Sequence, residues 1–546
     1  MAAVSGLEER WSTELCGGRL YHFSWLGDRL VRVWTPPGWS KGKVPKALWL
    51  NDGQNLFRDE EAFGGASWGA AGTVAHLISC GAIPEILVLG MDHSGRMRTF
   101  DYLSVPPTGW DAPWGKGMRG DMWDAPGGGV DAYMEMLFSE VIPWAQSHFG
   151  LSEAPEDRVF GGSSFGGICA LYMARSYPRA WAGFLVESPS FWAGNGRFME
   201  DVKTWQSSKM YPDRMYLAMG EFEYTGFRGT DRPGSLECDR VLREACEECA
   251  GHLRPHIGSG LLSFLEPGGR HNERDWGRRF PCALRWLFGL PSSSPQQIWT
   301  RPSPLRPGPF ELFVRRGAVK LPEGKRLQVH LGFNDWSCGV QTCDLLPSGL
   351  ALADGDEPVL AALGSVPDGA SGMKLVFTNG DAWDNNSGKD YCLDESGKAE
   401  TMDDIENKRN ETMEEIRQKA REIGDEGADA KIEEVWKSPT LQQYMSKGSK
   451  SGSLIQEYAK LHFEVEEFKS KIQAAQSGSA KNEQVAAEHR KLREVAKEQA
   501  SALEAALQAL QQDQEAMRRS LDDVAKDEAQ VNLQRQSLER TVNWAK

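Results

Sequence analysis

The chain contains 546 residues, with a formal net charge of −15 and a hydrophobic content of 40%. A chain of this length exceeds one hydrophobic core, so we expect roughly two to four domains. The negative charge argues against nucleic acid and membrane surfaces as partners, because both attract basic proteins, and it favours an uncharged substrate. No apolar run is long enough to cross a bilayer, and the N-terminus lacks the basic and apolar regions of a secretory signal. We therefore expect a cytoplasmic protein.

The ten cysteines are scattered along the chain and do not suggest a disulfide framework. Cys246 and Cys249 form a CxxC pair, but they fall in a helical stretch with no second pair. Free thiols account for them better than a zinc or redox site does. We expect no metal and no other cofactor.

Residues 1–290 alternate short apolar runs with helical patterns. The runs are continuous and bounded by turn residues, as in strands buried on both faces. They fall at 46–52, 85–92, 157–164, 182–188 and 214–220. Strands that alternate with helices predict an α/β domain with a parallel sheet covered on both sides. Residues 19–39 predict an antiparallel hairpin ahead of this sheet.

Three further regions differ in composition from the first. Residues 291–309 are rich in proline and serine, which is typical of a semi-rigid linker. Residues 310–396 alternate apolar and polar residues between Gly, Asp and Pro turns, which predicts an all-β sandwich. Residues 397–546 carry an apolar seam with a seven-residue repeat, which predicts a helical coiled-coil region and self-association. A single solvated helix is the alternative, because the companion seam is broken. The seam comprises Leu503, Leu510, Met517, Val524, Val531 and Leu538.

The strongest catalytic signal is the segment GSSFG at 162–166. It matches the G-x-S-x-G pattern and lies between a predicted strand and a predicted helix, as that pattern requires. Small residues two before and two after the serine let the helix pass close to the strand, and the turn lifts the hydroxyl above the sheet. We predict that Ser164 is a nucleophile. The alternative is a glycine-rich turn without chemistry.

A serine nucleophile needs a base, and His271 lies in a glycine-flanked loop after the last apolar run. His252 and His256 are less well placed, because they precede that run. The acid is expected to follow the strand at 214–220, in agreement with the α/β-hydrolase order of nucleophile, acid and histidine. Glu223 is the first choice. The alternatives are Glu221 and a dyad without an essential acid.

Two backbone N–H groups are expected to bind the oxyanion that forms during acyl transfer. Phe165 supplies one, because it directly follows the nucleophile at the start of a helix. Gln54 supplies the other, from the loop after the strand at 46–52. Asp52 is expected to be a structural residue that fixes the loop.

Residues 20–288 resemble the putative esterase family, which includes enterochelin esterases, feruloyl esterases and esterase D. The matching motifs are LNDGQNLF (50–57), ASWGAAGTV (66–74), MRTFDY (97–102), GGSSFGG (161–167), MGEFE (219–223) and GGRHNERDW (268–276). The resemblance implies an α/β-hydrolase fold and ester hydrolysis by a Ser–His–Asp/Glu triad. The acid motif of the family falls on residues 220–223 and supports Glu223, although Glu221 stands where the family has Thr. The resemblance also implies that the insert at 106–129 shapes the substrate pocket.

Two segments of the β region, 329–336 and 375–391, place tryptophans beside amides and carboxylates. A flat aromatic ring stacks on the apolar face of a sugar, while planar amides or carboxylates bind its hydroxyl rim. The alternative is that the tryptophans belong to the core, which fits Trp336 better than Trp383. The candidate sugar-binding residues are His330, Asn334, Trp336, Trp383, Asp384, Asn385 and Asn386.

Residues 310–395 resemble the starch-binding modules of carbohydrate-binding family 25. The matching motifs are H-x-G-x-N-x-W at 330–336 and W-D-N-N at 383–386. The resemblance implies a β-sandwich that binds α-1,4-glucan by stacking. It places His330, Trp336 and Trp383 against the sugar rings and Asn386 at the rim.

Together these patterns predict a serine carboxylic-ester hydrolase held on starch or a related α-glucan. The alternative is a non-catalytic glucan-binding scaffold that self-associates through its coiled coil. The intact serine, histidine and acidic positions favour the enzyme.

Overall fold

The computed structural model describes residues 7–393, with gaps. The gaps are 26–28, 44–45, 107–126, 206–209, 229–234, 291–293, 295, 335, 351–356, 371 and 389. All described residues belong to the first of two compact units, Met1–Ser451. The predicted coiled-coil region at 397–546 and most of the insert at 106–129 lie outside the described residues.

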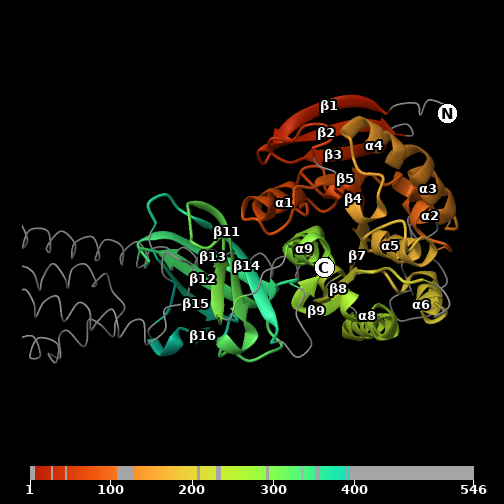
Figure 1. Ribbon diagram of the computed structural model, residues 1–546. Helices are drawn as coiled ribbons and strands as arrows, with labels where there is room; N and C mark the ends of the chain where they lie inside the picture. The colour runs from red at the N-terminus through yellow and green to blue at the C-terminus, as the bar shows by residue number, and fades with distance from the viewer. Residues whose placement is uncertain are drawn as a thin grey trace, which may run out of the picture. The chain divides into compact units, whose positions relative to one another are not determined.

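The N-terminal domain is built on a nine-stranded sheet in the order β1-β2-β3-β5-β4-β6-β7-β8-β9 (Figure 1). The strands are β1 (Glu8–Leu15), β2 (Gly18–Trp25), β3 (Arg29–Thr35), β4 (Ala47–Asn51), β5 (Leu87–Met91), β6 (Arg158–Ser163), β7 (Gly183–Glu187), β8 (Met215–Phe222) and β9 (Leu261–Arg270). The first three strands are antiparallel, and β3 joins β5 antiparallel. The neighbouring pairs from β5 to β9 are parallel. This is the predicted α/β class, and the five predicted parallel strands and the hairpin are present.

β1 lies outside the prediction. Its sequence, EERWSTEL, is mostly polar, and its side chains are largely exposed. An apolar pattern therefore could not reveal it, and its place at the sheet edge depends on pairing with β2.

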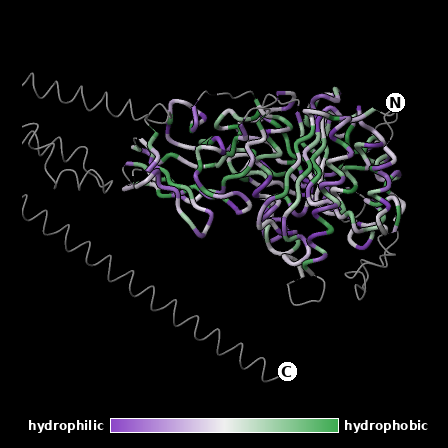
Figure 2. Tube along the Cα trace, turned by 90° about the horizontal axis from the view of Figure 1, so that it is seen from below, coloured by the Kyte–Doolittle hydropathy of each residue, from purple (hydrophilic) through white to green (hydrophobic). Residues whose placement is uncertain are grey.

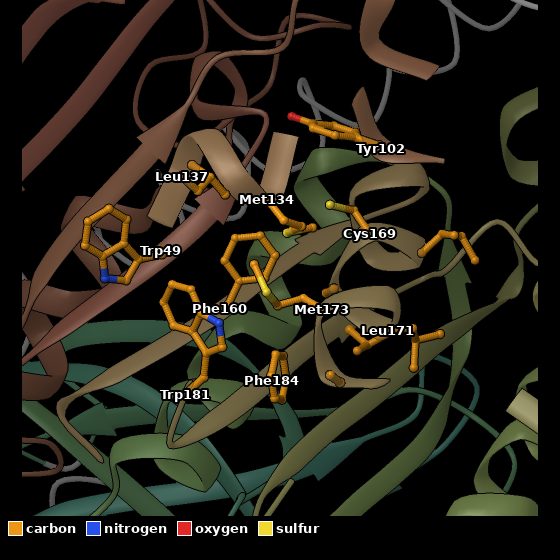
Figure 3. Packing of buried hydrophobic residues seen from close by; sticks show 14 of the residues in the cluster. Trp49, Tyr102, Met134, Leu137, Phe160, Cys169, Leu171, Met173, Trp181 and Phe184 are labelled. Carbon is orange, nitrogen blue, oxygen red and sulfur yellow. The ribbon is translucent and has the colours of Figure 1, made fainter. Parts of the chain in front are cut away.

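Alternate side chains of the parallel strands enter two hydrophobic cores, one on each face of the sheet. On β4, Trp49 belongs to the first core, whereas Leu48 and Leu50 belong to the second. This double burial explains why the strands read as continuous apolar runs. Figure 2 shows hydrophobic residues gathered along the strands, and Figure 3 shows Phe160 and Trp181 packed together in the first core.

Helices cover both faces of the sheet. They are α1 (Ala70–Ser79), α2 (Arg98–Tyr102), α3 (Val130–Met136), α4 (Ile142–Phe149), α5 (Phe165–Ser176), α6 (Arg197–Lys203), α7 (Thr225–Arg228), α8 (Ser235–Ile257) and α9 (Glu273–Phe288). The first core includes residues of α3, α4, α5 and α8, and the second includes residues of α1 and α9. Within the described ranges, no helix is long and apolar enough to cross a membrane.

The second domain is all-β, as the sequence predicts. Its strands are β10 (Ile298–Arg301), β11 (Gly308–Arg315), β12 (Leu327–Phe333), β13 (Cys338–Pro347), β14 (Val359–Val366), β15 (Met373–Thr378), β16 (Trp383–Asp384) and β17 (Tyr391–Leu393). β13 pairs with β12 along most of its length and with β14 at its end, so it joins two antiparallel groups of strands. Both groups contribute to one hydrophobic core.

The predicted linker at 291–309 contains a strand, which corrects the domain boundary. Residues 298–301 form β10 and pair with β11. Ile298 enters the β-domain core, whereas Trp299 stacks on Phe313 in a smaller neighbouring cluster. The sequence did not predict β10, because the proline and serine residues around it give the segment the composition of a linker.

Candidate active site

Ser164 occupies a sharp turn between β6 and α5. Its backbone has φ 59° and ψ −121°, a left-handed conformation that L-residues rarely adopt and that is typical of strained functional turns. The two flanking glycines allow this geometry. A Cβ added at Gly162 would lie 2.9 Å from the backbone of Gly166, and one added at Gly166 would lie 3.1 Å from Asn51 Cβ.

The structure brings the three predicted triad residues together at the carboxyl ends of the strands. The Ser164 hydroxyl oxygen lies 3.0 Å from His271 Nε2, and His271 Nδ1 lies 2.5 Å from Glu223 Oε2. The serine follows β6, the glutamate follows β8 and the histidine follows β9. A base within hydrogen-bond reach of a nucleophile, itself oriented by a carboxylate, is the arrangement that nucleophilic serine catalysis needs.

The alternative catalytic residues lie elsewhere. The carboxylate of Glu221 accepts a hydrogen bond from the Gly268 backbone at 2.8 Å and so ties β8 to the end of β9. On α8, His252 lies 4.0 Å from Glu248, and His256 stacks on Tyr211. The geometry therefore favours Glu223 and His271.

Glu223 is held on both of its oxygens. The side chain is buried, and Oε1 accepts hydrogen bonds from Ser188 Oγ at 2.8 Å and from the Gly220 N–H at 2.6 Å. Burial favours the neutral acid, but His271, the nearby Arg279 charge and the Gly220 N–H outweigh it and lower the pKa of Glu223. The carboxylate is therefore ionised at neutral pH and suited to stabilise a histidine cation.

The direction of the Ser188 hydrogen bond follows from its other partners. Trp276 Nε1 lies 3.0 Å from Ser188 Oγ and Arg279 Nη2 lies 3.2 Å from it, and both groups are donors only. The single Ser188 hydroxyl proton therefore goes to an acceptor, and Glu223 Oε1 at 2.8 Å is closer than Glu187 Oε1 at 3.4 Å. Ser188 itself is fully buried and adopts φ 41°, a second left-handed residue at this edge of the sheet.

A buried charge network lies directly behind Glu223. Arg279 is fully buried and donates to Glu187 Oε1 at 2.8 Å and to Glu266 Oε2 at 2.6 Å. Burial raises the pKa of Glu187 to about 7, although Arg279 opposes this shift. The Arg279 guanidinium, which is paired with these two carboxylates, also acts electrostatically on Glu223 and contributes to keeping it ionised.

The loop after β4 lines the same cleft as Ser164 and is held by hydrogen bonds of its side chains. Gln54 belongs to a short 3-10 helix, Gly53–Asn55, and lines the cleft with Phe165. Asp52 has φ 59° and forms two hydrogen bonds with Arg98, at 2.8 and 2.7 Å. Burial opposes ionisation of Asp52, but Arg98 outweighs it and lowers the pKa of this carboxyl. Asp52 therefore fixes the loop, and the oxyanion role of Gln54 and Phe165 stays a prediction.

The triad opens into a cleft of about 910 Å³. Aromatic side chains form much of its wall, and Phe63 at its edge is 64% exposed. Charged side chains occupy the region around His271. The aromatic lining comprises Phe63, Phe165, Trp192, Tyr224 and Trp276, and the charged lining comprises Arg98, Arg270, Arg274, Arg278, Arg326, Glu223, Glu273 and Asp275. The cleft thus combines apolar contact area with localised charge.

Sequence reasoning missed several polar residues of this site. The Ser190 hydroxyl lies 3.0 Å from the Ser164 hydroxyl, and Ser188 and Arg279 support Glu223. A signal was present in the segment ESPS at 187–190, where polar residues directly follow a buried strand at the carboxyl edge. Arg279 carried no such signal, because it falls within a helix.

The β domain places two of the predicted sugar-binding side chains together. The rings of His330 and Trp383 pack edge to face with centroids 4.7 Å apart, and Trp383 is 58% exposed. Trp336 is partly buried, and its Nε1 donates to Asp390 at 2.8 Å. An exposed indole beside an imidazole offers a stacking surface on this domain.

Most of the polar side chains that were predicted to bind the hydroxyl rim of a sugar form hydrogen bonds within the β domain instead. Asp384 is buried, and its carboxylate accepts hydrogen bonds from the Lys320 N–H at 2.7 Å and from Tyr391. Asp384 is therefore a structural residue of its loop, which corrects its assignment as a sugar contact. Asn386 donates to the Asp390 carbonyl at 3.0 Å, and Asn385 Oδ1 accepts from the Gly388 N–H at 3.0 Å.

Asn334 is also used internally. Its side-chain amide donates to the Gly369 carbonyl at 3.3 Å. A hydrogen-bonding rim around Trp383 thus requires these amides to use the hydrogen-bonding capacity that they have left.

Comparison with known proteins supports an esterase. Residues 26–287 match the family described as putative esterase. The chain is 26% identical over 187 residues to a siderophore triacetylfusarinine C esterase from Aspergillus fumigatus, across 33% of this chain and 57% of that protein. It is 33% identical over 70 residues to an iron(III) enterobactin esterase from Dickeya dadantii, across 13% of this chain and 16% of that protein.

A solved siderophore hydrolase from Aspergillus nidulans is similar with a TM-score of 0.37 and 19% identity, across 48% of this chain and 94% of that one. The chain spans 57% and 16% of the lengths of the two curated relatives. The family match covers most of the N-terminal domain, which is therefore similar to the esterases of that family.

Proposed function

We propose that the protein hydrolyses carboxylic esters, with Ser164 as nucleophile, His271 as general base and Glu223 as the acid that orients it. The observation that carries this proposal is the continuous contact from Glu223 through His271 to Ser164 on the wall of a large cleft. Buried structural networks also contain such residues, but they do not aim a strained serine into an open cleft.

The reaction proceeds in two balanced halves. The Ser164 oxygen attacks the acyl carbon while His271 Nε2 accepts the hydroxyl proton, and the N–H groups of Phe165 and Gln54 bind the carbonyl oxygen as it becomes an anion. The C–O bond to the alcohol breaks, and the alcohol leaves with the proton from His271. Water then attacks the acyl-serine by the same route and releases the carboxylic acid.

Hydrolysis of p-nitrophenyl butyrate tests this proposal. We expect turnover by the full-length protein and a loss of about 10,000-fold or more in kcat for Ser164→Ala, with the folded state confirmed by circular dichroism. Equal rates for the two proteins would contradict the esterase proposal.

We also propose that the β domain binds starch or a related α-glucan through the ring pair of Trp383 and His330. The exposed indole and its edge-to-face imidazole support this proposal. The domain would then hold the enzyme near glucan-bound esters. The siderophore substrates named for the relatives are a further candidate class, and they require no glucan binding.

Cosedimentation with granular starch, with cellulose as the comparison polymer, tests the glucan proposal. Binding to starch and not to cellulose is expected, because the proposed site is specific for α-glucan. If the protein sediments equally little with starch and with cellulose, the proposed role of the β domain in starch targeting is wrong, and the esterase proposal is unaffected.

A further inference from the structure

The charge of the catalytic cleft is opposite to the charge of the whole chain. The protein carries a formal net charge of −15, yet five arginines and three acids line the cleft. The local electrostatic field inside a cleft has more influence on which substrate is attracted than the net charge of the whole protein has. The overall charge alone therefore does not decide the substrate.

Two of these arginines are occupied within the protein. Arg98 forms its two hydrogen bonds with Asp52. Arg278 pairs with Glu266 at 2.7 Å and with Asp275 at 2.6 Å. These guanidinium groups are held by buried carboxylates, and their charge is largely balanced.

Arg270 and Arg274 differ from them. In the described part of the chain, neither forms an ion pair within 4.0 Å, although Arg274 acts electrostatically on Asp59. The stem of Arg270 is packed against α7, because a Cβ added at Gly226 would lie 2.6 Å from its Cγ. Both residues flank His271 in sequence and line the same cleft.

The acids that line the cleft do not neutralise this pair. Glu223 is paired with His271, and Asp275 is paired with Arg278. Glu273 accepts a hydrogen bond from Asn55 at 3.1 Å, and burial raises its pKa to about 7, so it is only partly ionised at neutral pH. No acid of the cleft lining therefore balances the positive charge of Arg270 and Arg274 beside His271.

A third arginine adds to the same field. Arg326 lines the cleft and donates from Nη2 to the Gly268 carbonyl at 2.9 Å, three residues before His271. Its nearest carboxylate contact is with Glu266, at 3.7 Å from Nε, and Glu266 is already shared by Arg278 and Arg279. Arg270, Arg274 and Arg326 thus line the same cleft as His271.

We infer that the physiological ester carries an anionic group, such as a carboxylate, that lies against Arg270 and Arg274 while its acyl carbon lies at Ser164. This inference rests on the proposed ester hydrolysis and names the substrate class for it. Guanidinium groups recognise carboxylates with directed, charge-assisted hydrogen bonds, and the aromatic walls leave room for an apolar body between the anion and the ester.

Two matched substrate pairs test the inference. Mono-p-nitrophenyl succinate is compared with p-nitrophenyl butyrate, which places the anion on the acyl side. 4-Acetoxybenzoate is compared with its methyl ester, which places the anion on the alcohol side. The variants are Arg270→Gln, Arg274→Gln and the double substitution, and the measured quantity is the ratio of kcat/KM for the anionic and neutral members.

We expect the full-length protein to prefer the anionic member of at least one pair, and the double variant to reduce that ratio by about five- to tenfold, since each exposed charge contact contributes modestly. Raising the NaCl concentration from 0.05 to 0.5 M is expected to weaken the preference. Arg179→Gln is the matched control, because Arg179 is exposed and pairs with Asp213 outside the cleft lining.

Unchanged ratios in both pairs, with the neutral esters still hydrolysed, would overturn the inference and leave the esterase function intact. Absence of hydrolysis of all four esters, equal to Ser164→Ala, would overturn the proposed function and the inference with it. The two failures are therefore distinct.

Discussion

The candidate sites of the two described domains differ in how their polar side chains are buried and bonded. In the N-terminal domain, buried polar side chains are bonded to one another behind Ser164, and the cost of burying them is offset by complete pairing. In the β domain, the candidate site is one exposed indole beside a histidine, and the neighbouring polar side chains point into the loop. A buried polar network is a more specific indication of chemistry than an exposed ring, because buried polar groups are costly and exposed apolar groups are common on protein surfaces.

After the loss of Ser164 itself, the largest effect is expected when the acid of the network is replaced. Glu223→Gln is expected to lower kcat about 1,000-fold, because an amide cannot stabilise the histidine cation as a carboxylate does. Initial rates with p-nitrophenyl butyrate measure the effect. Glu221→Gln is the matched control and is expected to stay within about threefold, since its carboxylate bonds only the Gly268 backbone among the described residues. A larger loss in the control would assign the acid to Glu221.

A stability measurement probes the same domain through Glu273. Burial raises its pKa to about 7 in the folded protein, above the value of 4.5 for an unperturbed glutamate. The folded state then binds more protons than the unfolded state between these values, so this group's stabilisation is present at low pH and is lost as the pH rises towards 7. Glu273→Gln is expected to be more stable than the wild type by about 2 kcal/mol at pH 8 and not at pH 5.

Urea unfolding at the two pH values measures this difference. Glu135→Gln, at an exposed position of α3, is the control and is expected to change neither midpoint. A Glu273→Gln variant that is no more stable than the wild type at pH 8 would show that the Glu273 carboxylate is not destabilising in the folded state.

The exposed site of the β domain is tested by Trp383→Ala. Removing the indole eliminates the stacking surface, and about a tenfold loss of affinity for starch is expected. Val340→Ala is the matched control, because Val340 is also exposed on this domain, at 61%. Retention of full binding by Trp383→Ala would remove the aromatic site from the account.

A smaller effect is expected from Ser188, which positions Glu223 without touching the substrate. Ser188→Ala and Ser188→Gly both remove the hydroxyl, but glycine also relieves the left-handed backbone. We expect about a fivefold loss of kcat in both variants with KM unchanged, since the hydroxyl donates a hydrogen bond to the charged Glu223 and accepts two more, from Trp276 and Arg279. A loss confined to Ser188→Ala would assign the effect to backbone strain instead.

The sequence predicted those features that depend on local patterns. The turn at Ser164 was predicted because it needs small residues at fixed positions, and the placement of Glu223 and His271 beside it because each follows a strand in a known order. The contacts of Ser188 and Arg279 were missed because they join segments far apart in the chain. Asp384 was misassigned because a carboxylate beside a tryptophan has the same sequence signature whether it points to solvent or into its own loop.

Covalent labelling tests the central claim, that Ser164 is an activated nucleophile, most directly. A fluorophosphonate probe reacts with a serine only when a neighbouring base activates it. Intact-mass and peptide analysis of the full-length protein is expected to show one adduct on the peptide that contains Ser164. The adduct is expected to be absent in Ser164→Ala and strongly reduced in His271→Ala. An adduct on another residue, or equal labelling of the wild type and His271→Ala, would contradict the account.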